Sequence, residues 1–533
     1  MHSRRSRSVP ALLTAVAALA ALALLVAACG TNADEGSAGG GGGDPGGPLT
    51  LAIAYTSEVD PDVFFDLELM SVTNAVYEGL VRYVPGGTDI EGVLAEDWTV
   101  SEDGLTYTFT LRDDIAFADG SPIDSAAVQA AFERKAAVAG PPSYILAEVD
   151  HYETPDETTF VVVLAQPVNN FMQRMASPAG SLITNPAVVA EHTVDDDLAQ
   201  GWLGTNSAGS GPYVIGEFVP DDRVVLVPNE NYWGEAPPFS EVVLRVVPDI
   251  ASQQLQVEQG DVDLIHDVSP ETAAQIESQG DLAVDAVYGI TQAFVQVNVT
   301  KPPFDDPAAA RAFAASIDRD QIVSEVFGEY GKVADQTAPE GVIPEGLATF
   351  EPDYDPDAFA EATADLPKDQ PVTLAGISPD PRNLSARVND YLATILRDAG
   401  YDAQIVEVQS ADYFGFIGVP DQAPTLTFSV QPGDGAAPAN WFDLFMTTYG
   451  ALNVGGIGSP EADALMVQGN SVPAPADPDF QSYSDASDLI VEQGGWIPIA
   501  DTPTIFVHPE DLTNVQMHMT VSPAVWVQDL RRG

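Results

Sequence analysis

Cysteine is almost absent from this 533-residue sequence, in which Cys29 is the only one. An intramolecular disulfide is therefore impossible. Basic residues are scarce as well, because 20 Lys and Arg face 80 Asp and Glu. Binding to nucleic acid requires clustered Lys and Arg that neutralise phosphates, so this imbalance excludes nucleic acid as a partner.

The common catalytic and metal-binding motifs are missing too. None of the six histidines forms a pair at metal-ligand spacing with another histidine or with cysteine. The glycines around Ser210 lack the spacing of a serine hydrolase elbow, and no Gly-rich loop ending in Lys is present to hold phosphates. We therefore expect no enzyme activity, no cofactor and no bound metal.

The formal net charge of −60 has two possible explanations. A negative field could attract cationic ligands, or it could keep a secreted surface soluble in a saline habitat. Only four residues are lysine, which suits the second explanation, and we favour it.

The single long apolar run lies at the N-terminus. Arg4, Arg5 and Arg7 precede an Ala/Leu/Val-rich stretch over residues 11–28. A basic start followed by an apolar segment and small residues predicts a signal peptide over residues 1–28. The alternative is a membrane-spanning helix, since the stretch is at the lower limit of spanning length.

The segment Val26-Ala27-Ala28-Cys29 resembles the lipobox of bacterial lipoproteins. The resemblance implies cleavage before Cys29, lipidation of that residue and attachment to the membrane by acyl chains. Residues 29–48 are rich in Gly and cannot bury enough apolar surface to order themselves, so we expect a flexible tether. The expected location is the extracellular face of the cytoplasmic membrane, or the periplasm.

Residues after the tether alternate between strand and helix patterns. Period-two or β-branched runs predict strands over residues 105–111, 159–164, 224–227 and 242–247. An amphipathic pattern predicts a helix over residues 384–399, between strands at 372–377 and 403–408. This order indicates a βαβ unit with parallel strands. A further helix is expected after Asp306-Pro307, and Asp318 to Phe327 either continues it or forms a second helix.

Several ordered motifs lie between residues 76 and 319. They include VYEGLVRY from Val76, LAEDW from Leu94, SEDGLTYTF from Ser101, GSGPY from Gly209, PNENYWG from Pro228, QGDVD from Gln259, and KPPFDD from Lys301. This set resembles family 5 of the bacterial extracellular solute-binding proteins. That family contains the oligopeptide, dipeptide and nickel-chelate binding components of ABC importers.

The resemblance implies an α/β fold of the type II periplasmic-binding-protein class, with two main lobes around a ligand cleft and an additional third lobe. Lobe I is expected to be discontinuous, over residues 49–76, 200–297 and 501–533. Lobe II is expected over residues 77–199 and lobe III over residues 298–500. The ligand would bind between lobes I and III, which are joined by crossovers near Phe294 to Asn298 and Ile499 to Thr502.

The implied function is capture of peptides by lobe closure and delivery to the permease subunits of an ABC importer. We expect a monomer attached to the membrane by its lipid anchor. The alternatives are a non-peptide solute in the same fold, such as a metal chelate, an opine or a sugar, and a ligand-sensing surface receptor.

In peptide-binding members an aspartate of the third lobe holds the ligand ammonium. The matching stretch is Gly433 to Phe442, and Asp434 falls on the aspartate position. Relatives often carry a second acidic residue where this chain has Ala437. The alternative for Asp434 is an exposed turn residue of a Gly-rich loop.

The other candidate ligand contacts also follow from the resemblance. Trp441 could line a side-chain pocket or anchor its loop. Phe294 lies at the predicted crossover. A first-lobe segment matches ligand contacts of relatives, or is a plain strand end, and its candidates are Thr56, Ser57, Glu58 and Val59.

Overall fold

The computed structural model describes residues 46–533 except 64–66, 379, 381, 410–411, 414 and 522. The predicted signal peptide, Cys29 and most of the predicted tether lie outside the described residues. Within the described part, no helix has the length and apolar character needed to cross a bilayer. The first strand begins at Pro48, the last residue assigned to the tether.

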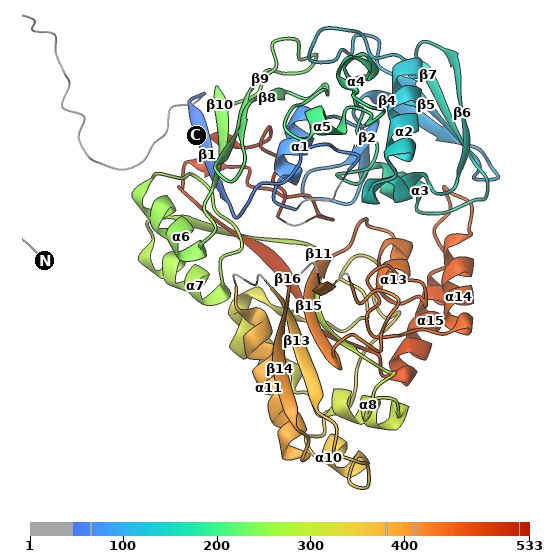
Figure 1. The fold of residues 1–533 in the computed structure, drawn as a ribbon, viewed down its shortest axis with the longest axis vertical. Helices are drawn as coiled ribbons and strands as arrows, with labels where there is room; N and C mark the ends of the chain where they lie inside the picture. Colours follow the sequence, from blue (N-terminus) through green and yellow to red (C-terminus); the bar gives the residue numbers. More distant parts are fainter. Residues whose placement is uncertain are drawn as a thin grey trace, which may run out of the picture. The chain divides into compact units, whose positions relative to one another are not determined.

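The first sheet has the strand order β1-β10-β9-β8, and we call it the β1 sheet (Figure 1). Its strands β1 and β10 are parallel, whereas β8, β9 and β10 are antiparallel neighbours. Alternate apolar side chains of β9 and β10 are buried, which confirms the predicted strands near 224–227 and 242–247. The bounds are Pro48–Ile53 for β1, Tyr213–Val219 for β8, Arg223–Pro228 for β9 and Glu241–Val246 for β10.

The second sheet, the β5 sheet, is antiparallel with the order β4-β5-β7-β6. Helix α2, capped at its start by the Asp124 side chain, packs on it through Phe132, which contacts Tyr152 and Phe160 edge-on. The strands predicted over 105–111 and 159–164 are confirmed. The bounds are Ala95–Val100 for β4, Thr106–Leu111 for β5, Ser125–Val138 for α2, Val149–Asp156 for β6 and Thr159–Leu164 for β7.

The third sheet, the β11 sheet, has the order β12-β16-β11-β15-β13-β14. Strands β13 and β14 are parallel and helix α11 packs along them, so the predicted βαβ unit is confirmed (Figure 1). The bounds are Ala283–Val297 for β11, Lys332–Val333 for β12, Val372–Ser378 for β13, Leu384–Asp398 for α11, Ala403–Gln409 for β14, Leu426–Pro432 for β15 and Trp496–His508 for β16.

The helix expected after Asp306-Pro307 is α8, Pro307–Ala315. The Asp306 side chain accepts a hydrogen bond from the Ala308 N–H, and Pro307 is the first helical residue, where its missing N–H has no cost. The chain then starts a second helix, because Asp318 caps α9, Arg319–Ile322, which continues as a π-helical turn over Val323–Phe327.

The remaining elements connect and cover these sheets. The helices are α1 Met70–Val76, α3 Phe171–Met175, α4 Pro186–His192, α5 Gln200–Leu203, α6 Ile250–Gln259, α7 Pro270–Gln279, α10 Ala358–Ala362, α13 Pro438–Phe445, α14 Pro460–Asn470 and α15 Phe480–Gln493, with 3-10 turns at Pro141–Leu146 and Gly328–Tyr330. The short strands are β2 Val81–Tyr83, β3 Ile90–Gly92, β17 Leu512–Thr513 and β18 Arg531–Arg532.

Three sequence motifs meet in a buried network around Glu78. Its carboxylate accepts hydrogen bonds from Ser210 Oγ at 2.8 Å, Tyr232 OH at 3.0 Å and Trp233 Nε1 at 2.8 Å. Burial raises the pKa of Glu78, and these donors oppose that shift. A Cβ on neighbouring Gly209 would lie 2.2 Å from the Val76 carbonyl oxygen, so only glycine fits there. The motifs therefore have a structural use here.

A buried ion cluster joins the segment after β1 to α2. Arg134 Nη2 lies 2.6 Å from Asp60 Oδ2, and Lys135 Nζ lies 2.6 Å from Asp62 Oδ1. Arg134 also pairs with Asp62. The four side chains are at most 4% exposed. Two cations balance two carboxylates, which makes the burial of all four charges tolerable.

We predict that Arg134→Met lowers the free energy of unfolding by about 3–5 kcal/mol, because it leaves buried carboxylates without their main partner. Urea unfolding measures the change. The matched control is Arg223→Met, which breaks the exposed pair with Glu217 and should hardly alter stability. Equal effects of the two substitutions would contradict the prediction.

Candidate functional site

Two charged residues follow neighbouring parallel strands of the β11 sheet. Strands β13 and β15 are parallel partners; Arg382 comes shortly after β13, and Asp434 shortly after β15. The carboxyl ends of parallel strands meet at one edge of a sheet, and ligands of open α/β sheets bind outside that edge. Both residues therefore belong to the edge at which a ligand is expected.

The loop that carries Asp434 is held at several points. The Gly433 N–H donates to the Ile290 carbonyl at 2.8 Å, which fixes the loop to β11. The Ala436 N–H donates to Tyr83 OH at 3.0 Å, and Asn170 Nδ2 donates to Asn440 Oδ1 at 3.2 Å. The Tyr83 side chain and helix α3, which follows Asn170, pack in the hydrophobic core of the β5 sheet. The loop thus lies where that core meets the β11 sheet.

Asp434 is partly buried, and its carboxylate is not paired with another described residue. No hydrogen bond or ion pair joins its carboxylate to another residue of the described part. Burial raises the pKa of Asp434 to about 6, and the Arg174 guanidinium opposes the shift only partly because Arg174 is paired with Glu148 at 2.6 Å. A carboxylate of this kind gains most from a cation that arrives with a ligand.

The guanidinium of Arg382 likewise forms no hydrogen bond or ion pair with a described residue. Every other arginine between residues 46 and 533 that the structure describes donates at least one hydrogen bond to a described residue, whereas Arg382 has neither a hydrogen bond nor an ion pair with one. Arg387 and Arg397, for comparison, donate to the backbone carbonyls of Val326 and Ala403 at 3.1 Å. Arg382 is therefore available to a carboxylate of a ligand.

The first-lobe candidates lie just after the carboxyl end of β1. The segment Thr56 to Val59 follows β1 and has no regular secondary structure. Thr56 Oγ1 accepts a hydrogen bond from the Asp221 N–H at 2.8 Å, and the Val59 side chain is buried in the core. Ser57 is partly buried, while Glu58 is exposed. Ligand contact by these four residues stays a prediction. Glu58 has the most accessible side chain of the four.

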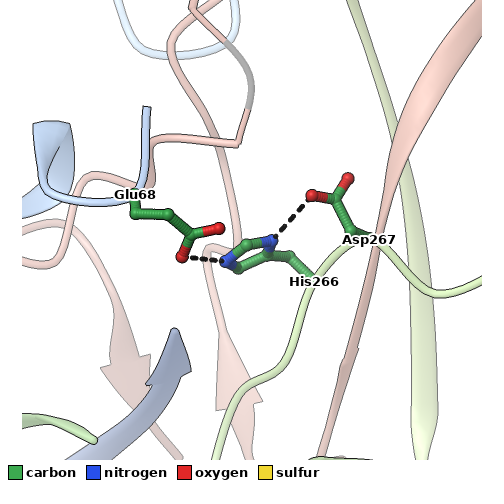
Figure 2. A group of neighbouring side chains, drawn as sticks. All are labelled: Glu68, His266 and Asp267. Atoms are coloured by element: carbon green, nitrogen blue, oxygen red, sulfur yellow. Dashed lines mark ion pairs between the residues drawn. The ribbon is translucent and has the colours of Figure 1, made fainter. Parts of the chain in front are cut away.

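Sequence spacing did not reveal a cluster made by Glu68, His266 and Asp267 (Figure 2). His266 and Asp267 follow the residues that bridge to β1 at Leu51, again at a carboxyl end. His266 Nε2 lies 3.5 Å from Glu68 Oε2, and Nδ1 lies 3.4 Å from Asp267 Oδ2. The only local signal was the adjacency of His266 and Asp267, because Glu68 comes from a distant part of the chain.

The electrostatics of this cluster connect the two sheets. Burial disfavours the charged imidazole, but Glu68 and Asp267 outweigh it and raise the pKa of His266 to about 10. Burial also disfavours ionised Asp267, but the neighbouring His266 and the Arg382 guanidinium outweigh it and lower the pKa of Asp267 to about 2. Arg382 of the β11 sheet thus acts on an aspartate that packs beside the β1 sheet.

Trp441 and Phe294 lie in the core beneath the Asp434 loop. Both side chains are fully buried. Trp441 Nε1 donates to the Thr337 carbonyl at 3.0 Å, and the Phe294 ring stacks on Trp496 with centroids 4.0 Å apart. This geometry agrees with the alternative in which Trp441 anchors its loop. Contact of either residue with a ligand stays a prediction.

The mixed α/β sheets, together with the solved structures that this chain resembles, confirm the predicted type II periplasmic-binding-protein fold class. The sequence profile of the bacterial extracellular solute-binding proteins, family 5 middle region, matches residues 89–453. The chain belongs to this family.

Comparison with individual proteins agrees. The probable D,D-dipeptide-binding periplasmic protein DdpA of Escherichia coli K12 is 31% identical over 326 residues, which cover 60% of this chain and 62% of that relative, less than two thirds of its length. The structure of Helicobacter pylori DppA with the peptide STSA has a TM-score of 0.78 at 21% identity, covering 92% of this chain and 98% of the other. Brucella suis NikA with Fe(III)-EDTA has a TM-score of 0.78 at 20% identity, covering 92% and 100%.

We predict that Asp434→Asn stabilises the unliganded protein at pH 7.5 by about 2 kcal/mol and has little effect at pH 3.5. Below the ordinary pKa of 3.8 the carboxyl is neutral in the folded and the unfolded state alike. Between pH 3.8 and about 6 the unfolded state releases its proton while the folded state keeps it, so the wild type loses stability relative to the variant, and the loss is complete above about pH 6. Urea unfolding at both pH values measures this, with the exposed Asp369→Asn as control. A pH-independent difference would contradict it.

Proposed function

We propose that this protein captures peptides that carry a free amine and a free carboxylate, and that it delivers them to the permease subunits of an ABC importer. The supporting observation is the pair of uncommitted charges, Asp434 and Arg382, after neighbouring parallel strands of one sheet. An ammonium group suits Asp434 and a carboxylate suits Arg382, in each case through charge-assisted hydrogen bonds. The names of the E. coli relative and the Helicobacter pylori complex, which specify dipeptide and peptide, agree with this ligand class.

Capture would work by closure of the lobes. In this proposal residues 49–76, 200–297 and 501–533 form lobe I, 77–199 form lobe II, and 298–500 form lobe III. A ligand held by Arg382 and Asp434 of lobe III and by the Glu58 segment of lobe I favours the closed form only through contacts that the open form lacks. The permease would recognise the closed form.

The second candidate ligand is a metal chelate, because Brucella suis NikA, with a similar fold, holds Fe(III)-EDTA. A carboxylate-rich chelate would engage Arg382 but offers no ammonium to Asp434. Peptide and chelate therefore make different demands on Asp434, and substitution of this residue separates the two.

Lipid attachment at Cys29 completes the proposal. A lipidated cysteine at the start of the mature chain, followed by the Gly-rich segment up to residue 48, would hold the protein at the extracellular face of the cytoplasmic membrane.

Expression of the full chain in a bacterial host, followed by membrane fractionation, tests the anchor. We expect Cys29→Ser to move the protein from the membrane fraction to the soluble fraction, because no thiol remains to carry an acyl chain. Thr31→Ala alters a nearby residue of the same segment and serves as the control, which should stay in the membrane fraction. Retention in the membrane of a Cys29→Ser chain that has lost residues 1–28, as judged by its mass, would refute the anchor.

Peptides with an acetylated N-terminus or an amidated C-terminus test the ammonium and the carboxylate of the ligand separately. We expect Asp434→Asn to weaken the binding of a free dipeptide or tripeptide about tenfold to a hundredfold, since a hydrogen bond to a charged group contributes about 1.5–3 kcal/mol. The variant should bind the N-acetylated peptide as weakly as the wild type does. Arg382→Gln should show the corresponding loss with free peptides and no further loss with C-terminally amidated ones.

Isothermal titration calorimetry measures these affinities. A control is Arg397→Gln, whose side chain is committed to the Ala403 carbonyl. Equal affinity of wild type and Asp434→Asn for every free-amine peptide would remove Asp434 from the site. Binding of EDTA chelates but of no peptide would favour the second candidate.

A further inference from the structure

A histidine between two carboxylates, His266, is imperfectly satisfied in the structure. Its Nε2–Glu68 and Nδ1–Asp267 separations of 3.5 and 3.4 Å are longer than ordinary N–H···O hydrogen bonds, which lie near 2.7–3.2 Å. His266 Nδ1 is buried and has no hydrogen-bond partner among the described residues. The side chains of His266 and Glu68 are only 11% and 10% exposed, so water contributes little there. Neither ring nitrogen of His266 therefore has a short hydrogen bond to its neighbouring carboxylate.

The Nε2–Glu68 separation suits two ligands of one metal ion. Zinc binds imidazole nitrogen and carboxylate oxygen at about 2.0–2.2 Å, and two such ligands at a tetrahedral angle lie about 3.4 Å apart. Imidazole is also a preferred ligand of divalent zinc, copper and nickel. An ion can therefore be placed between Nε2 and the Glu68 carboxylate without a large rearrangement.

Asp267 stands on the opposite side of the ring, as Figure 2 shows. A histidine that binds a metal almost always donates its second N–H to a carboxylate, a carbonyl or a water, which fixes the orientation of the ring. Asp267 is in place to accept from Nδ1. Glu68 is oriented as well, because its Oε2 accepts a hydrogen bond from the Ala54 N–H at 3.0 Å.

His151 provides a comparison within the same chain. It also lies between two carboxylates, with Nδ1 2.8 Å from Asp150 and Nε2 3.5 Å from Glu153. Its side chain is 49% exposed, those of the carboxylates are more exposed still, and its Nδ1 already has a short hydrogen bond. A metal bound there would compete with water and with flexible side chains. His151 therefore serves as the control for adventitious metal binding to the acidic surface.

We propose that Glu68 and His266 bind a divalent transition-metal ion, of the zinc or nickel class, with Asp267 as the positioning residue for the imidazole. The ion binds Nε2 and a Glu68 oxygen, the Nε2 proton is released to solvent, and Nδ1–H donates to Asp267. Water, or donor atoms of a solute, complete the coordination. The site goes beyond the proposed peptide-binding function and does not depend on it.

Equilibrium dialysis of the chelator-treated protein against Zn²⁺ and, separately, Ni²⁺ tests the site. We expect the wild type to retain one equivalent with the highest affinity, and His266→Asn and Glu68→Gln to lose that equivalent. Asp267→Asn should bind about 10- to 100-fold more weakly, the usual effect of removing the partner of a metal-bound histidine. His151→Asn should bind as the wild type does.

Co²⁺ provides a spectroscopic readout that a merely structural role would not change. The visible absorption of bound Co²⁺ should appear in the wild type and in His151→Asn and be lost in His266→Asn. Thermal unfolding without metal establishes that each variant is folded, and Glu68→Asp serves as a second, charge-conserving variant with reduced affinity if Glu68→Gln fails to fold.

The proposal would be overturned if His266→Asn bound as much metal as the wild type does. It would also be overturned if His151→Asn lost the tightly bound equivalent, because that loss indicates adventitious binding at the surface. Peptide titrations of His266→Asn keep the two proposals apart. Metal loss with unchanged peptide affinity supports the metal site alone, whereas failure of Asp434→Asn to alter peptide binding concerns only the proposed function.

Discussion

The pairing of β11 with β16 is the constraint on which the architecture depends. These strands are hydrogen-bonded antiparallel partners along most of their length, with an irregular register between Tyr288 and Gln292. Beyond that point β16 contributes Phe506 to the hydrophobic core of the β1 sheet, while on the near side Phe294 and Trp496 lie in the core beside the Asp434 loop. Two cores thus share two strands.

Buried charged residues away from the candidate site are paired, whereas Asp434 and Arg382 at the candidate site are not paired with a described residue. Arg134 and Lys135 pair with Asp60 and Asp62, and Glu78 accepts three hydrogen bonds, so each of these buried charges has its partners. At the carboxyl ends of the parallel strands, Asp434 and Arg382 have no hydrogen bond or ion pair with a described residue. A solute-binding protein needs this contrast, because a charge already paired internally gains little from a ligand.

Periodic patterns predicted the elements well. The βαβ unit of β13, α11 and β14, the capped start of α8 and the strands of the β5 sheet follow from residues that are neighbours in the chain, because backbone geometry repeats locally. Asp434 was predicted from a family resemblance, but its environment was not. Its raised pKa comes from burial in a loop held by Tyr83, Asn170 and β11, which are remote in sequence.

The sequence by itself determined the class of protein: a single cysteine, an acidic composition, an N-terminal apolar run and an ordered motif set are all readable along the chain. Only the tertiary structure decided which charges are available. It committed Arg387 and Arg397 to backbone carbonyls, left Arg382 without a hydrogen bond or ion pair to a described residue, and brought Glu68 to His266. The physical reason is that pairing and burial depend on distances between segments that are far apart in the chain, whereas helix and strand patterns depend on near neighbours.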